Sequence, residues 1–453
     1  MQDAKSQCAG RYFGALVVAL ALISGGFTPA APVTAEKALD WCNGDDHATP
    51  DMMIAGCSAM ISSGEYSGRD LAIAYTNRGS AYDDKRDEDR AIADHDLAIK
   101  IDPKLDLAFN NRGNAYTRKG EPDRAIEDYN EAIRLNPKFF MAWINRGKTY
   151  RDDKHEYTRA ISDYDEAIRI NPDFADAYNS RGIAYDSLGK RDLALVDYDS
   201  AIRLDPKFAL AYNNRGLEYL EKRDYDTAIA DFSKAVTIAP GYANAFRNRG
   251  NAWYGKADYP SAISDYSAAL AINDNDSDVH LARGVAYEKN GDSDAAIADY
   301  DKVLATNPQD NNTLGMRGYL HFYRGDFADA AADLLRVAAS SPYPYPSLIG
   351  YLAQSRSGQA APDLQPAMQR LKNQDWPYPV FELFLGRRDP QAVLDAAQKP
   401  EERCEAQFYV GEWQLLKGDR AAARPYLVDA EGSCPKTFIE YNAARAELQR
   451  LGQ

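Results

Sequence analysis

Apolar and polar residues recur along most of the chain with a period of 34 residues, apart from one step of 35 in the third repeat. An Arg-Gly pair marks each repeat. Aromatic residues lie four before and three after most of the glycines, and an alanine follows twelve or thirteen residues later. The marker glycines are Gly79, Gly113, Gly147, Gly182, Gly216, Gly250, Gly284 and Gly318. The repeat therefore extends over residues 72–342.

Each repeat contains two amphipathic stretches of about fourteen residues, separated by a short polar turn and usually ended by proline. This pattern predicts a helix hairpin, and stacked hairpins predict an all-α, right-handed solenoid. Glycine inside a helix costs about 1 kcal/mol relative to alanine. We therefore expect the glycine of the first helix to face the alanine of the second helix, so that the two backbones approach closely.

These positions resemble the tetratricopeptide-repeat (TPR) family. The 34-residue pattern of that family has aromatic residues at positions 4 and 11, small residues at 8, 20 and 27, and proline at 32. The resemblance implies eight regular repeats, followed by a degenerate repeat and a last repeat at the C-terminus. The chain departs at position 7, where the family usually has leucine and all eight repeats here have arginine.

An aspartate on the second helix is as regular as this arginine. The arginines are Arg78, Arg112, Arg146, Arg181, Arg215, Arg249, Arg283 and Arg317. The aspartates are Asp94, Asp128, Asp163, Asp197, Asp231, Asp265, Asp299 and Asp333. Strict periodicity of both partners favours a structural ladder of ion pairs. The alternative is a row that binds anions, which we would expect in a few repeats only.

A stack of hairpins places its first helices on one concave face. On that face we expect a row of asparagines whose amides, with both donor and acceptor groups, hold an extended peptide. The row consists of Asn77, Asn110, Asn111, Asn114, Asn145, Asn179, Asn213, Asn214, Asn248 and Asn251. Repeats seven and eight offer apolar side chains instead, namely Leu281, Val285, Met316 and Tyr319. The alternative is that the amides only hydrogen-bond neighbouring helices.

The flanking segments differ from the array. Residues 1–35 have the basic start, apolar run and small residues of a cleaved export signal. Residues 36–71 are predicted to be an N-terminal cap with a helix from about Pro50 to Ile61. Residues 343–403 are predicted to be an irregular helical connector, and residues 404–453 a last repeat with a capping helix.

Four cysteines remain after removal of the signal, one pair near each end of the chain, which predicts two disulfides in an oxidising compartment. In the last repeat, the start of the first helix should lie beside the end of the second helix. The predicted pairs are Cys42 with Cys57 and Cys404 with Cys434.

The C-terminal part is also similar to the end of the enterobacterial new-lipoprotein-I family. The similarity includes the segments 381–386, 408–412, 416–419 and 438–441. That family consists of outer-membrane TPR lipoproteins that act as adaptors for peptidoglycan hydrolases and a periplasmic protease. This chain has a longer array and no usable lipidation cysteine, so the resemblance implies an adaptor without implying the same anchor or protease.

The formal net charge is −15. This acidity argues against nucleic-acid binding and favours neutral or basic protein partners. The sequence has no phosphate loop, nucleophile elbow or zinc-protease motif, so we expect no enzyme activity, cofactor or metal. We expect a periplasmic or secreted scaffold without an integral membrane span in the mature chain. The alternative is a stoichiometric structural subunit of an envelope or secretion assembly.

Overall fold

The computed structural model describes residues 34–45, 47–371 and 375–452, and all regular secondary structure in these ranges is α-helical. The predicted fold class, an all-α solenoid of helix hairpins, is confirmed. Most of the predicted export signal, residues 1–33, lies outside the described residues. The chain divides into two compact units, residues 1–222 and 223–453. Each unit is described by itself.

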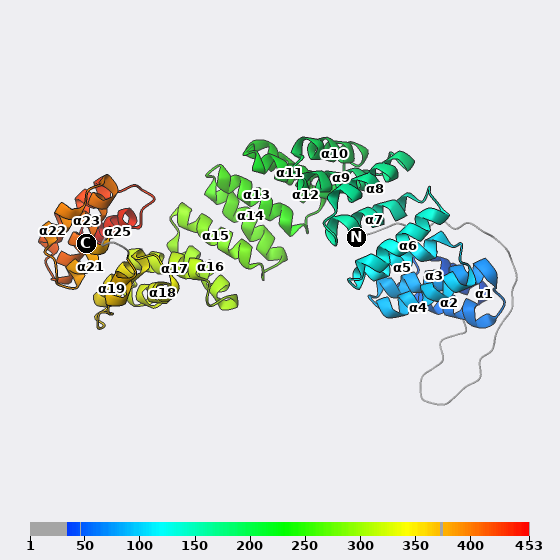
Figure 1. The fold of residues 1–453 in the computed structure, drawn as a ribbon, viewed down its shortest axis with the longest axis horizontal. Coiled ribbons are helices and arrows are strands. Elements are labelled where there is room, and N and C mark those ends of the chain that lie inside the picture. Colours follow the sequence, from blue (N-terminus) through cyan, green and yellow to red (C-terminus); the bar gives the residue numbers. More distant parts are fainter. Residues whose placement is uncertain (1–33, 46, 372–374, 453) are drawn as a thin grey trace, which may run out of the picture. The chain divides into compact units, whose positions relative to one another are not determined.

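In the first unit, consecutive helices pack side by side as antiparallel pairs (Figure 1). Its helices are α1 (Ala35–Asn43), α2 (Pro50–Ser63), α3 (Gly68–Asp84), α4 (Glu88–Ile101), α5 (Asp106–Arg118), α6 (Pro122–Leu135), α7 (Phe140–Asp152), α8 (Tyr157–Ile170), α9 (Ala175–Ser187), α10 (Arg191–Leu204) and α11 (Ala209–Glu221). Repeats one to four are α3–α4, α5–α6, α7–α8 and α9–α10, and α11 is the first helix of repeat five.

The second unit begins with the second helix of repeat five and contains repeats six to eight. The helices of these repeats are α12 (Tyr225–Ile238), α13 (Ala243–Gly255), α14 (Tyr259–Ile272), α15 (Ser277–Asn290), α16 (Ser293–Thr306), α17 (Asn311–Arg324) and α18 (Phe327–Ser340). The C-terminal helices are α19 (Tyr345–Arg356), α20 (Gln365–Gln369), α21 (Tyr378–Phe384), α22 (Pro390–Ala396), α23 (Pro400–Leu416), α24 (Arg420–Ser433) and α25 (Ile439–Gly452).

The proline that usually ends a repeat explains the backbone geometry of the turn to the next repeat. Each such proline disfavours helical geometry in the residue before it. Asp102, Asn136 and Asp205 accordingly adopt φ between −128° and −139° and ψ between 88° and 93°, and each ends a second helix. This extended residue turns the chain toward the next first helix.

The marker glycine faces an aromatic ring, and the expected contact with alanine is wrong. A Cβ atom added to Gly147 would lie 2.8 Å from Cε1 of Tyr164 on α8. The glycines of repeats two, four, six and seven face tyrosine in the same way, and Gly79 faces His95. The missing side chain thus makes room for the flat face of a ring, while Ala160 and its equivalents are fully buried beside it.

The N-terminal segment forms a hairpin of its own. Helices α1 and α2 pack together, and a disulfide joins Cys42 to Cys57 with the Cα atoms 4.6 Å apart. A Cβ atom on Gly56 would lie 2.6 Å from the backbone oxygen of Ala38. Here glycine does allow two backbones to approach closely, and the predicted cysteine pair covalently fixes that contact.

The C-terminal helices share one apolar core with α17 and α18. A second disulfide joins Cys404 to Cys434, with the Cα atoms 5.0 Å apart, as the hairpin geometry predicts. The last helix, α25, packs against α24 and also against α17. Arg450 of α25 donates to the backbone oxygen of Tyr323, 2.7 Å away, and so ties the end of the chain to the last regular repeat.

Candidate partner-binding face

The arginine and aspartate rows form paired contacts inside the repeats. In the seven repeats whose two helices lie in one unit, Nε and Nη2 of arginine donate to the two aspartate oxygens at 2.6–2.9 Å. The aspartates are only 2–5% exposed. Such two-point contacts are strong because both partners are charged and their geometries match. Arg215 and Asp231 belong to different units, and their pairing stays a prediction.

Each arginine has a third contact that the sequence analysis missed. Its Nη1 donates to a side chain on the second helix of the preceding hairpin. These acceptors are Ser58, Asp96, Asn130, Asp165, Asp199, Ser233, Ser267 and Asp301. The arginine therefore clamps neighbouring hairpins together, which the leucine typical of the family at this position could not do. The signal was present, because an acceptor recurs two residues after the aspartate in repeats one to seven, and only Asp333 of repeat eight is followed there by leucine.

The asparagine row is largely used inside the array. Asn110, Asn179, Asn213 and Asn248 are 1–6% exposed, so they are not available as contacts in an open groove. Nδ2 of Asn145 donates to Oδ1 of Asn110 at 3.0 Å, and Nδ2 of Asn214 donates to Oδ1 of Asn179 at 3.0 Å. In these two pairs the amides hydrogen-bond between neighbouring first helices, as the alternative interpretation expects.

Other asparagines of the row hold tyrosine hydroxyls or remain partly exposed. Asn114 accepts from Tyr129 and Asn251 accepts from Tyr266, each at 2.8 Å. Asn111 donates to Ser80 at 3.0 Å, and Asn77 is partly buried. The amide row is thus mainly a set of internal contacts between adjacent first helices.

The apolar residues of repeats seven and eight are also partly covered. Leu281, Val285 and Met316 pack against the core beneath α15 and α17. Tyr319 packs against the C-terminal core, where Glu440 of α25 lies close enough to help raise its pKa. The C-terminal helix of the chain therefore already occupies the apolar surface around Tyr319.

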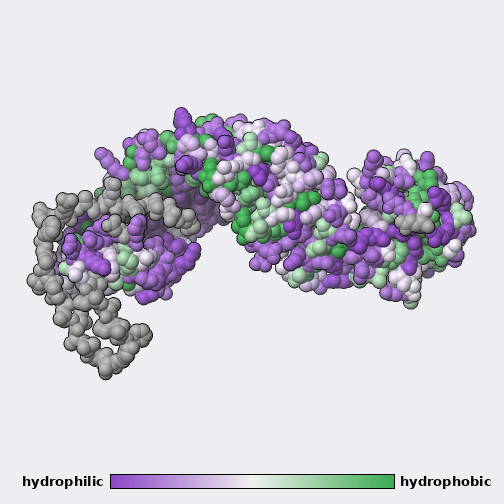
Figure 2. Space-filling view, turned by 180° about the vertical axis from the view of Figure 1, so that it is seen from behind, coloured by the Kyte–Doolittle hydropathy of each residue, from purple (hydrophilic) through white to green (hydrophobic). Residues whose placement is uncertain are grey.

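Exposed apolar side chains occur outside the predicted row. Figure 2 shows a surface that is mostly hydrophilic, with apolar side chains in separate patches. In repeat five, Leu210 and Leu217 of α11 are 39% and 36% exposed. Val196 of α10, a second helix, is 61% exposed. We use the name first-helix face for the exposed side of α3, α5, α7, α9 and α11.

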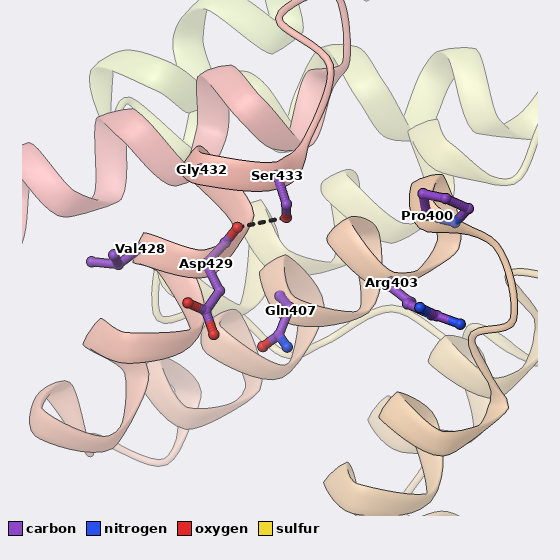
Figure 3. A pocket seen from close by; sticks show the side chains of 7 residues that line it. All are labelled: Pro400, Arg403, Gln407, Val428, Asp429, Gly432 and Ser433. Carbon is purple, nitrogen blue, oxygen red and sulfur yellow. Dashed lines mark hydrogen bonds between the residues drawn. The ribbon is translucent and has the colours of Figure 1, made fainter.

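An open cavity of about 620 Å³ lies between α23 and α24. Figure 3 shows Pro400, Arg403 and Gln407 on one helix and Asp429 and Ser433 on the other. Arg403 is engaged with the backbone oxygens of residues 397 and 398, and Ser433 donates to the backbone oxygen of Asp429. These side chains form no nucleophile–base arrangement.

Among the described residues, no group of three or more His, Cys, Asp or Glu side chains is placed to hold a metal ion. No helix in the same ranges is both long enough and apolar enough to cross a membrane.

The geometry defines a class of protein: a solenoid of helix hairpins with a glycine and a small residue at fixed positions, in which the glycine faces a ring in six repeats and Leu334 in repeat eight. Models of the tetratricopeptide repeat match residues 72–105, 107–139, 175–208, 209–242 and 247–311, and a TPR repeat model matches residues 153–189. The chain belongs to the tetratricopeptide-repeat family.

The chain is similar in part to several solved structures, of which three are described here. MamA is 31% identical over 37% of this chain and 96% of its own chain, with a TM-score of 0.33. YrrB, described as a TPR protein with an unusual peptide-binding site, is 23% identical over 40% and 93%, with a TM-score of 0.33. A chain of the APC/C hetero-tetramer Cut9–Hcn1 is 20% identical over 60% and 52%, with a TM-score of 0.46.

Proposed function

We propose that this protein is a non-enzymatic scaffold that binds a protein or an extended peptide on its first-helix face. The observation that carries the proposal is a contrast between constant and variable positions. The framework of glycine, arginine and aspartate is the same in every regular repeat. A framework that builds identical hairpins leaves the exposed positions free to differ, and those positions then determine what is bound.

The position directly after the marker glycine illustrates this contrast. It holds Asn114 in repeat two, Lys148 in repeat three, Ile183 in repeat four and Leu217 in repeat five. Amide, cationic and apolar side chains thus follow one another along the same face. This sequence of chemistries suits one elongated partner whose successive residues meet successive repeats.

The compartment and pathway belong to the same proposal. Two disulfides in the described residues favour an oxidising compartment. The pattern of residues 1–35 and the similarity to the new-lipoprotein-I family support export and an adaptor role in the cell envelope. Fusion of residues 1–35 to alkaline phosphatase, which is active only after export, tests the first point. An inactive fusion would contradict it.

A photo-crosslinking amino acid placed at two sites tests the binding face. Leu217 lies on the first-helix face, and Val196 is an exposed apolar residue on a second helix of the same unit. We expect a discrete crosslinked partner in cells from position 217 and none from position 196.

The control at position 196 separates specific binding from nonspecific hydrophobic association. Equal crosslinking from both positions would indicate contact through exposed apolar side chains alone. Crosslinking from position 196 only would overturn the proposed face and place the partner on the second helices.

A further inference from the structure

A buried glutamate interrupts the framework in repeat five. The position two residues after the marker glycine holds alanine or threonine in six of the other regular repeats and leucine in the eighth. In repeat five it holds Glu218, which is 3% exposed. Burying a carboxylate is unfavourable unless donors compensate for the lost water. The hairpin framework does not require this residue, because its equivalents are small and uncharged.

The surroundings of Glu218 supply little compensation. On the neighbouring first helix α9, the carboxyl group of Asp186 lies within hydrogen-bonding reach of Glu218. Nε of Arg191 is 3.7 Å from Oε2 of Glu218, too far for a hydrogen bond, and no donor among the described residues reaches that oxygen. Burial and the negative charge of Asp186 raise the pKa of Glu218 to about 7.

Only one of the two carboxyl groups is open to solvent. Asp186 is exposed, whereas Glu218 lies buried behind it, and Leu217, which precedes Glu218 in the sequence, is 36% exposed. Tyr198 of α10 is 2% exposed and contributes the buried side of the site. The site therefore has an exposed carboxyl group on Asp186 and, on Glu218, a buried carboxylate oxygen without a hydrogen-bond donor.

We propose that Asp186 and Glu218 form a pocket for a basic side chain, lysine or arginine, of the partner bound on the first-helix face. This inference rests on the proposed function. An ammonium or guanidinium group supplies the missing hydrogen-bond donors and the opposite charge. The apolar stem of the same side chain can lie along Leu217. On binding, the cation replaces the proton that the two carboxyl groups share.

A positional-scanning library of acetylated, amidated nonapeptides tests the pocket with the full chain. We expect wild-type protein to enrich lysine or arginine at one peptide position. The variant Glu218→Ala introduces the residue of most other repeats, and we expect it to lose this enrichment and to bind the selected peptide at least tenfold more weakly. Asp186→Asn, at an exposed position, provides a second variant should Glu218→Ala fold poorly.

A matched control removes the same charge from the same helix. Glu221 of α11 has a side chain that is 65% exposed, and it pairs with Nη2 of Arg191 at 3.5 Å. We expect Glu221→Gln to retain the enrichment and to change the affinity less than twofold, because an exposed ion pair of this kind contributes little. Equal losses in Glu218→Ala and Glu221→Gln would overturn the pocket in favour of general electrostatic attraction.

The pH dependence gives an independent readout. The groups that face the site are Asp186 on α9, Arg191 and Tyr198 on α10, and Lys222 after α11. Affinity for the selected peptide should rise between pH 6 and 8 in wild type and stay flat in Glu218→Ala. If peptides bind wild type without a basic preference, this inference fails alone. If no peptide in the library binds, the proposed function fails with it.

Discussion

Removing one arginine clamp should destabilise the array strongly. Arg181 donates to both oxygens of Asp197, at 2.8 and 2.7 Å, and to Asp165 of the preceding repeat at 2.5 Å. Asp197 is 2% exposed. Replacing Arg181 with leucine restores the residue typical of the family but leaves a buried carboxylate without its cation. Removal of one partner from a buried pair costs about 3–5 kcal/mol.

Two companion variants show where the loss arises. In Arg181→Leu with Asp197→Leu, both charges are gone, so we expect most of the stability to return. Asp165 has a side chain that is 52% exposed, so Asp165→Asn removes only the outer contact and should cost about 1 kcal/mol or less. Burial already raises the pKa of Asp197, while Arg181 lowers it. The single variant should therefore recover some stability at low pH, where the orphaned carboxyl becomes protonated.

Hydrogen exchange measured by mass spectrometry is the suitable assay, because a repeat array need not unfold as one cooperative unit. A loss of about 3–5 kcal/mol should accelerate exchange in α9 and α10 by roughly two to four orders of magnitude. Exchange within a factor of two of wild type in Arg181→Leu would refute the reasoning, since the clamp would then contribute nothing. A double variant as unstable as the single one would refute the assignment to the orphaned Asp197.

Two further predictions concern single side chains. Burial raises the pKa of Glu440 from 4.5 to about 7, so the folded state binds the proton more tightly than the unfolded state and stability is full below pH 4.5. The free energy of unfolding should fall by about 3 kcal/mol as the pH rises to 7. We expect Glu440→Gln to abolish this pH dependence in urea titrations that follow the unfolding of α25 in the second unit. An unchanged pH profile in the variant would contradict the assignment. Gly147→Ala should destabilise the folded protein by about 1–3 kcal/mol, because the new Cβ atom would lie 2.8 Å from the ring of Tyr164. Gly432→Ala on α24 is the control: its Cβ atom would meet open space, so this variant should be more stable than wild type by about 0.5–1 kcal/mol. Thermal unfolding compares the two, and stabilisation by both would show that the ring contact gives way.

Features that depend on the repeat period could be predicted from the sequence. The repeat period predicts the helix hairpins and the register of residues between the two helices of each hairpin. That register predicts that Cys404 lies beside Cys434 and that Arg146 lies beside Asp163. Both predicted disulfides are present in the structure.

Features that depend on side-chain direction or on distant segments could not be predicted in this way. The spacing puts Gly147 near both Ala160 and Tyr164, but only the packed ring decides which of them it faces. Asn110 has the chemistry of a ligand-binding residue, yet the neighbouring helix buries it. The contact of α25 with α17 joins segments more than a hundred residues apart, and no local pattern encodes it.

The division of the chain into two compact units after Lys222 likewise has no counterpart in the sequence. The repeat pattern continues without change from Gly216 to Ala228. The division falls inside repeat five, between α11 and α12, where nothing in the repeat pattern marks it.

The third contact of each arginine has a consequence for how such a chain changes in length. The acceptor on the preceding hairpin is serine, asparagine or aspartate, and each of them satisfies the same guanidinium nitrogen. Within repeats one to seven, any hairpin can therefore be followed by any other with an acceptor in place for the next arginine. A duplication or deletion of one repeat in phase within this part of the array creates a junction that is already complementary. The array can thus gain or lose modules by single genetic events, and the exposed positions of each new copy are then free to diverge.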